Sequence, residues 1–144
     1  MQNEILTNSL SEISPDIQYC NPYLQQLHTE CKQIQEFLKQ TADLRNPDSL
    51  VERLNAISVY VARLAEMLFQ VKTMKNLATR QVQEDNIGYF EKLGVMEKTK
   101  VVNNLILEFS AVTDQVELAY ASAKDICRSL LTQISYIKQQ ITLL

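Results

Sequence analysis

Residues 49–71, with the sequence SLVERLNAISVYVARLAEMLFQV, decide the fold class of this chain. Within this stretch, apolar residues recur at alternating intervals of four and three: Leu50, Leu54, Ile57, Val61, Leu64, Leu68 and Val71. This spacing places all of these side chains on one face of an α-helix. Ser49 and Glu52 have the types and spacing of a capping box at the start, and no glycine or proline follows before Gly88. The pattern predicts a helix over residues 49–85.

Two further stretches show the same spacing. Before the central stretch, Asn21 and Pro22 have the residue types that are preferred at a helix start. The apolar positions that follow predict a helix over residues 21–44: Leu24, Leu27, Cys31, Ile34 and Leu38. After the central stretch, the alternation continues from Val102 to Ile141 without glycine or proline, which predicts a helix over residues 97–142.

Two segments lie outside these helices. Residues 1–20 form a polar leader, which either adds a short helix or remains an arm that contacts a neighbour. Residues 86–96 contain both glycines of the chain, Gly88 and Gly94, but also many apolar side chains. We expect residues 86–96 to form a compact corner packed on the end of the helices. A mobile lid is the alternative.

The composition supports an all-α fold. A β-rich fold of 144 residues needs many turns, and turns use glycine and proline, yet the chain has 2 glycines and 3 prolines. We therefore predict a single helical domain over residues 1–144. Its architecture is predicted to be an elongated bundle of three long amphipathic helices with a short N-terminal segment.

The unequal lengths of the helices favour a homo-oligomer. The first helix is about half as long as the third by this reading, so it cannot cover the other two from end to end. Further apolar residues flank the stripes of the second and third helices: Val59, Tyr60, Met67, Phe69, Ile106, Leu118, Tyr120 and Leu131. A stripe at this spacing requires a partner along its whole length, which another copy of the chain would supply. A monomer with a well-buried central helix is the alternative.

Several observations point to the cytoplasm. The three cysteines, Cys20, Cys31 and Cys127, form no CxxC pair and are typical of a reducing compartment. The first residues resemble no signal peptide, and no stretch approaches 18 consecutive apolar residues, so no membrane partner is expected. The net charge of −3 argues against nucleic acid as a partner, because that binding depends on a positive excess.

The sequence contains no recognisable catalytic apparatus. Its single histidine, His28, lies at the edge of the first apolar stripe, where a solvent-exposed position is expected rather than a metal ligand or base. Hydrolase, zinc-protease, nucleotide-binding and dinucleotide-binding motifs are all missing. We therefore predict a chain that is not an enzyme and has no cofactor, metal or catalytic residue.

Basic and hydroxyl side chains on the second and third helices are the candidate binding residues: Arg63, Lys72, Lys75, Arg128, Ser135 and Lys138. The segment 72–80 contains no acidic residue, and arginine presents a fork of donors that suits phosphate or carboxylate groups. These residues predict a site for an anionic small molecule such as a nucleotide. The alternatives are pairing of the basic residues with acids of the first helix, and a solvent-exposed polar face.

Residues 54–68, LNAISVYVARLAEML, resemble a recurring block of small phage and prophage proteins, LN-x-Y-(L/V)-A-R-x-x-x-ML. Residues 128–138, RSLLTQISYIK, are similar to the end of the last helix of those proteins but contain an insertion. The resemblance extends over residues 47–140. It implies a small accessory protein that is made during phage infection and located in the host cytosol.

Three functions are consistent with these observations. The first is a non-enzymatic, homo-oligomeric helical module that binds itself or a host protein. The second is a counter-defence protein that sequesters a nucleotide signal or inhibits a host defence enzyme. The third is an accessory of phage DNA replication or recombination.

Overall fold

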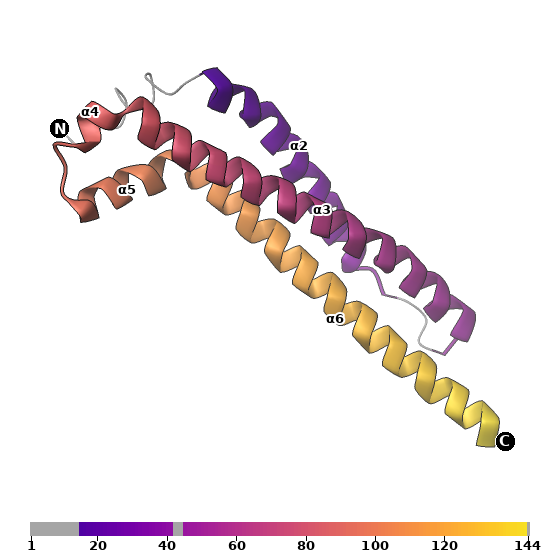
Figure 1. Ribbon diagram of the computed structural model, residues 1–144. Coiled ribbons are helices and arrows are strands. Elements are labelled where there is room, and N and C mark those ends of the chain that lie inside the picture. The colour runs from indigo at the N-terminus through magenta and orange to yellow at the C-terminus, as the bar shows by residue number, and fades with distance from the viewer. Residues whose placement is uncertain (1–14, 42–44, 144) are drawn as a thin grey trace. The chain divides into compact units, whose positions relative to one another are not determined.

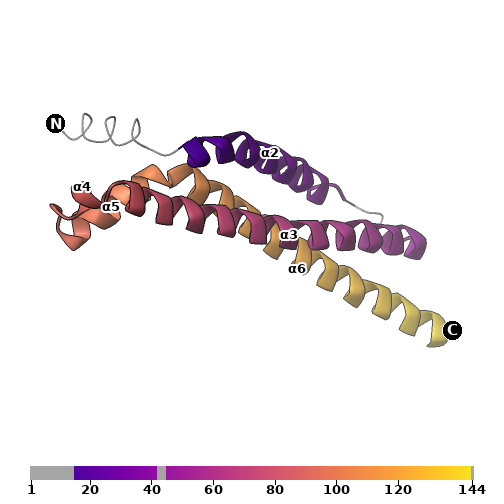
Figure 2. The ribbon, with the colours of Figure 1, turned by 45° about the horizontal axis from the view of Figure 1, so that its top comes forward.

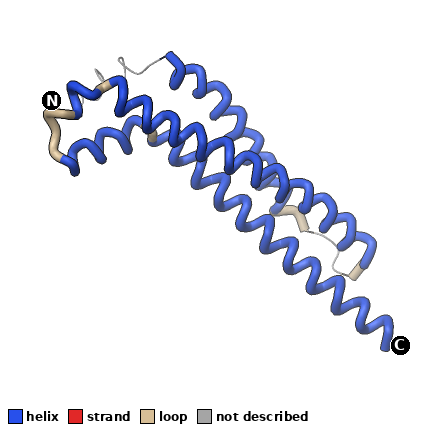
Figure 3. Tube along the Cα trace, viewed as in Figure 1, coloured by secondary structure: helices blue, strands red, loops and turns tan. Residues whose placement is uncertain are grey.

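The structure is a computed structural model, which describes residues 15–41 and 45–143, with side chains from residue 22 onwards. Five helices follow one another in these residues: α2 (Pro15–Leu38), α3 (Pro47–Asp85), α4 (Ile87–Phe90), α5 (Val95–Leu105) and α6 (Leu107–Leu143) (Figure 1). The described residues include no strand (Figure 3). The predicted all-α class is confirmed. The number of long helices and the elongated bundle remain predictions.

The described residues fall into two compact units. The first unit takes its residues from Met1–His28 and Phe69–Asp114, and the second from Thr29–Leu68 and Gln115–Leu144. The helices α2, α3 and α6 each contribute to both units, whereas α4 and α5 belong to the first unit alone. The single domain over residues 1–144 remains a prediction, and each unit is described by itself below.

The core of the first unit is apolar and draws on all five helices. Its buried side chains are Leu24, Leu27, Val71, Met74, Ala78, Val82, Phe90, Val102, Ile106, Phe109 and Val112. Two polar side chains are also buried there, Asn86 and Thr113. Both are satisfied locally, since Asn86 donates to the carbonyl of Val82 at 2.9 Å and Thr113 donates to that of Phe109 at 2.6 Å.

The second unit packs segments of α2, α3 and α6 side by side (Figure 2). Cross-helix contacts fix their directions. Glu30 and Phe37 of α2 contact Arg63 and Tyr60 of α3, respectively, so these two helices are antiparallel. The buried side chains of this unit are Cys31, Ile34, Leu50, Ile57, Leu64, Met67, Val116, Ala119, Ala123 and Leu130.

The apolar stripe of α3 is buried largely as predicted, but the buried face is displaced around the helix axis from the predicted one. Leu50, Ile57, Leu64 and Val71 of that stripe are fully buried. The intervening positions, Leu54, Val61 and Leu68, are only half-buried. Met67 and Met74 are buried in their place, because the flexible thioether side chain adapts to the space between helices.

Two predicted helix starts are wrong. The first helix begins at Pro15 rather than at residue 21, and Pro22 lies inside it. Pro15 now takes the first helical position, where a missing N–H has no consequence. The central helix begins at Pro47 rather than at residue 49. Asn46 is its cap: the Asn46 Oδ1 atom accepts from the N–H groups of Asp48 at 3.0 Å and Ser49 at 3.4 Å.

The predicted helix over residues 97–142 is divided in the structure. Its place is taken by α5 and α6, which meet at Ile106, where the backbone angles are φ −102° and ψ 15°. No proline or glycine causes this break, so the sequence contains no local signal of it. The predicted corner over residues 86–96 contains α4 and the first residues of α5. Phe90 is buried there, which favours a packed corner over a mobile lid.

The end of the first predicted helix also differs. The helix α2 ends at Leu38, whereas the prediction placed the end at residue 44. The Arg53 guanidinium of α3 binds this end, because its Nη2 atom donates to the carbonyls of Phe37, Leu38 and Gln40 at 2.9, 3.3 and 2.6 Å. Two of these carbonyls, those of Phe37 and Leu38, belong to the last turn of α2, where the helix itself supplies no further N–H donors. Of the predicted leader, residues 1–14 lie outside the described residues.

Candidate functional site

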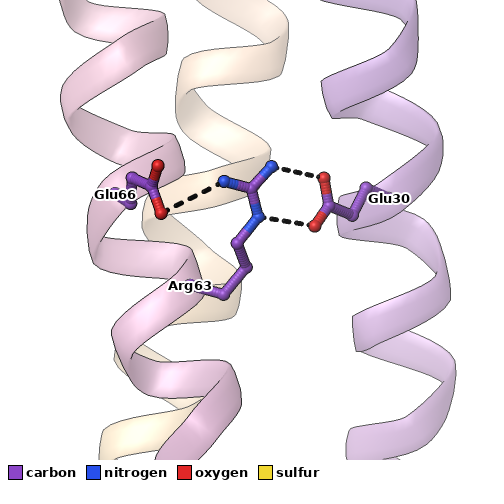
Figure 4. A network of polar contacts seen from close by, with 3 residues as sticks. All are labelled: Glu30, Arg63 and Glu66. Atoms are coloured by element: carbon purple, nitrogen blue, oxygen red, sulfur yellow. Dashed lines mark hydrogen bonds and ion pairs between the residues drawn. The ribbon is translucent and has the colours of Figure 1, made fainter.

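Arg63 of α3 is the centre of a charged cluster in the second unit (Figure 4). Its Nε and Nη2 atoms donate to the two carboxylate oxygens of Glu30 on α2, at 2.6 and 2.7 Å. Its Nη1 atom lies 3.3 Å from the Glu66 carboxylate, one turn further along α3. This two-point pairing is the strongest geometry available to an arginine and a carboxylate.

The cluster shifts the ionisation of both partners. The hydrogen bonds from Arg63 lower the pKa of Glu30, against a smaller opposing effect of burial. The hydrogen bond to Glu30 raises the pKa of Arg63. All three nitrogen atoms of the guanidinium thus face carboxylates. This arrangement matches the structural alternative, in which a basic residue pairs with an acid of the first helix.

A second arginine of α3 has a structural role as well. Arg53 lies over the Phe37 ring, with 4.5 Å from its guanidinium carbon to the ring centre. It also binds the three carbonyl groups at the end of α2 described above. Phe37 in turn packs on Tyr60, with 4.8 Å between ring centres. The end of α2 is therefore held by side chains of α3.

The other predicted binding residues are distributed over both units. Lys72 and Lys75 belong to the first unit, and Arg128, Ser135 and Lys138 belong to the second. Arg128 pairs with Asp125 of the same helix at 3.4 Å, and both side chains are exposed. Ser135 and Lys138 are exposed on α6. Within the second unit no described contact brings Arg63 together with Arg128, and the anion site remains a prediction.

A groove in the first unit is a feature that the sequence did not indicate. It has a volume of about 590 Å³ and lies between the end of α3, α4 and α5. Phe90 and Val102 are buried in its walls, whereas Ile87 and Val95 are exposed at its edge. Its size is within the range of small-molecule and side-chain binding sites. The only sequence signal was the unusual apolar content of residues 86–96.

Two charged side chains line the groove, Glu91 and Lys98. Glu91 directly follows α4 and is exposed, and Lys98 of α5 is half-buried. Neither forms an ion pair with any described residue. The groove therefore combines apolar walls with one acidic and one basic group that are open to a partner.

The described residues contain no group of three histidine, cysteine or acidic side chains that could hold a metal ion. His28 is exposed, as the sequence predicted. None of the helices between residues 15 and 143 combines the length and hydrophobicity needed to cross a membrane. Comparison with models of protein families, with curated proteins and with solved structures found no match to this chain.

Proposed function

We propose that this chain is a non-catalytic helical interaction module that associates with further copies of itself. The observation that carries the proposal is the exposure of large apolar side chains on otherwise well-packed helices. Val95 of α5 is 80% exposed and Phe69 of α3 is 73% exposed. Clusters of such side chains on a folded protein commonly mark interaction surfaces.

Six of the exposed apolar side chains lie in two short stretches of the chain. In the first unit, Ile87, Val95 and Met96 gather at the helices that form the groove. In the second unit, Leu131, Ile141 and Leu143 lie in the last turns of α6. Burying these groups against a partner would remove apolar area from water, which is the main favourable contribution to protein association.

The charged side chains give less support to the nucleotide-binding alternative. Arg63 is engaged by two carboxylates, and Arg128 lies beside Asp125. An anionic ligand at either arginine would have to compete with these acidic groups. The counter-defence and replication roles, like the phage origin, remain predictions.

Sedimentation or light scattering from low to high micromolar concentration tests the proposal. We expect a mass above the 16.5 kDa of one chain, increasing with concentration. A mass that stays at one chain over the whole range would reject self-association. A thermal-shift screen of nucleotides with the same protein would show whether an anionic ligand stabilises it instead.

A further inference from the structure

The groove of the first unit offers a site with defined chemistry. Its apolar walls include the buried side chains of Phe90 and Val102 and the exposed side chains of Ile87 and Val95. A volume of about 590 Å³ accommodates several aliphatic side chains, which is how an amphipathic helix anchors in a groove. The groove therefore suits a helix with an apolar stripe better than a small polar ligand.

The last turns of α6 carry such a stripe. The apolar spacing that includes Leu130 continues through Ile134, Ile137 and Ile141. These side chains become more exposed to solvent toward the end of the helix. Leu130 is buried, Ile134 and Ile137 are half-buried, and Ile141 is 62% exposed. Ile134, Ile137 and Ile141 have the i, i+3, i+7 spacing of groove-binding anchors.

One charged group of the groove has a counterpart of opposite sign on α6. Residues 131–143 contain one charged side chain, Lys138, and no acidic residue. Lys138 lies four residues after Ile134 and three before Ile141, so it borders the stripe on the helix surface. It is exposed and forms no ion pair with the described acids. The exposed Glu91 at the groove is its natural counterpart.

We propose that the groove of one copy binds the α6 stripe, Ile134, Ile137 and Ile141, of a second copy, with Glu91 of the first copy paired to Lys138 of the second. The inference rests on the proposed self-association and names its two surfaces. The pairing of Glu91 with Lys138 sets the position of the bound helix along the groove. Lys98 of the groove meets no like charge other than Lys138, since the other polar residues of 131–143 are uncharged serine, threonine, glutamine and tyrosine.

The contact joins two different surfaces, so it is heterologous. Each copy that uses its groove keeps a free stripe, and each copy that uses its stripe keeps a free groove. Association of this kind continues into longer chains of copies unless the rotation between them closes a ring. Two copies that face each other through the same surface would instead stop at a dimer.

Two surface variants make this geometry testable. Val95→Glu blocks the groove, and Ile141→Glu blocks the stripe. Both side chains are largely exposed, so the helices should remain folded, which circular dichroism checks. We expect each variant alone to have the mass of one chain. Mixed in equal amounts, they should form a complex of two chains and no larger one, because one intact groove and one intact stripe remain.

The matched control is Leu118→Glu, a substitution of an equally exposed apolar residue (65%) that belongs to neither surface. It should associate as the unaltered chain does. Glu91→Lys should weaken association roughly two- to fivefold, as expected for an exposed ion pair. A partner carrying Lys138→Glu should restore it.

The outcomes separate the two proposals. If the unaltered chain remains monomeric, self-association fails and this inference fails with it. If the unaltered chain associates but neither Val95→Glu nor Ile141→Glu reduces its mass, only the groove-and-stripe contact is rejected. If both variants become monomeric but their mixture does too, the contact is not heterologous and the inference is also rejected.

Discussion

At the scale of single residues, two arginines of α3 show how neighbouring polar groups determine a role. Arg53 and Arg63 both lie on the face of α3 that contacts α2. Arg53 binds backbone carbonyls at the end of α2, whereas Arg63 binds the carboxylate of Glu30. The first completes a helix end, and the second joins two helices through charge. The sequence indicated Arg63 as a candidate anion ligand but gave no indication of Arg53.

The pair of Glu30 and Arg63 should contribute measurably to stability. In a double-mutant cycle with Glu30→Gln and Arg63→Gln, we expect a coupling free energy of about 1 kcal/mol, since the pair is two-pronged and partly buried. Urea unfolding of the four proteins measures it. The control cycle on Asp125 and Arg128, whose side chains are exposed, should give a coupling close to zero. Equal couplings in both cycles would contradict this account.

Cys31 should be chemically inert in the folded protein. Its side chain is fully buried, and burial together with the nearby Glu30 charge raises the pKa of the thiol to about 11. Because the thiolate is the reactive form, iodoacetamide should label Cys31 only after unfolding. In a Cys20→Ser background, the half-buried Cys127 should react first, as read by peptide mass spectrometry. Equal labelling rates in the native protein would contradict the burial of Cys31.

At the scale of helices, Asn46 rather than Ser49 should determine the stability of the start of α3. Asn46→Ala removes an acceptor for two backbone N–H groups and should cost about 1 kcal/mol. Ser49→Ala should change the unfolding free energy by less than about 0.5 kcal/mol. Urea unfolding compares the two variants. A larger loss of unfolding free energy for Ser49→Ala than for Asn46→Ala would instead support the capping box that the sequence suggested.

How far the sequence predicted the helices depends on the kind of signal. The stripes of α2, α3 and α6 were predictable because burial follows helical periodicity, as Leu24, Ile57 and Val116 show. Helix starts were less predictable. Several capping residues competed, and Pro22 is accommodated inside a helix that begins at Pro15. The break at Ile106 was not predictable, because no glycine or proline lies near it.

At the scale of the whole molecule, acid should weaken the protein partly through Glu30. Its pKa is lower in the folded chain than in the unfolded chain, so its contribution is present above the usual glutamate pKa of about 4.3. That contribution is lost as the pH falls through the lowered pKa of the folded state. Glu30→Gln should therefore destabilise the chain at neutral pH and much less in acid. Urea midpoints at both pH values test this, and an equal loss at both would contradict it.

The candidate binding surfaces were only partly accessible from the sequence. The α6 stripe is visible in the periodicity of Ile134, Ile137 and Ile141, although periodicity does not tell which turns remain uncovered. The groove depends on α4, a helix of four residues, and on the direction in which α5 leaves the corner. Neither follows from local residue preferences, and both accompany the burial of Phe90 and Val102 in the first unit.

The junction at Ile106 affects the direction of α5 in the first unit. Hydrogen bonding continues across it, since the Ile106 N–H donates to Val102 and the Ile106 carbonyl accepts from Ser110, each at 3.0 Å. The direction of α5 relative to the first residues of α6 therefore depends on the torsions of Ile106, which differ from the helical values of about −63° and −42°. Because a helix rises about 1.5 Å per residue, a change in the torsions of Ile106 would move the far end of α5 more than its near end. Because Val95, Lys98 and Val102 of α5 line the groove, the width of the groove depends on the φ and ψ angles of Ile106.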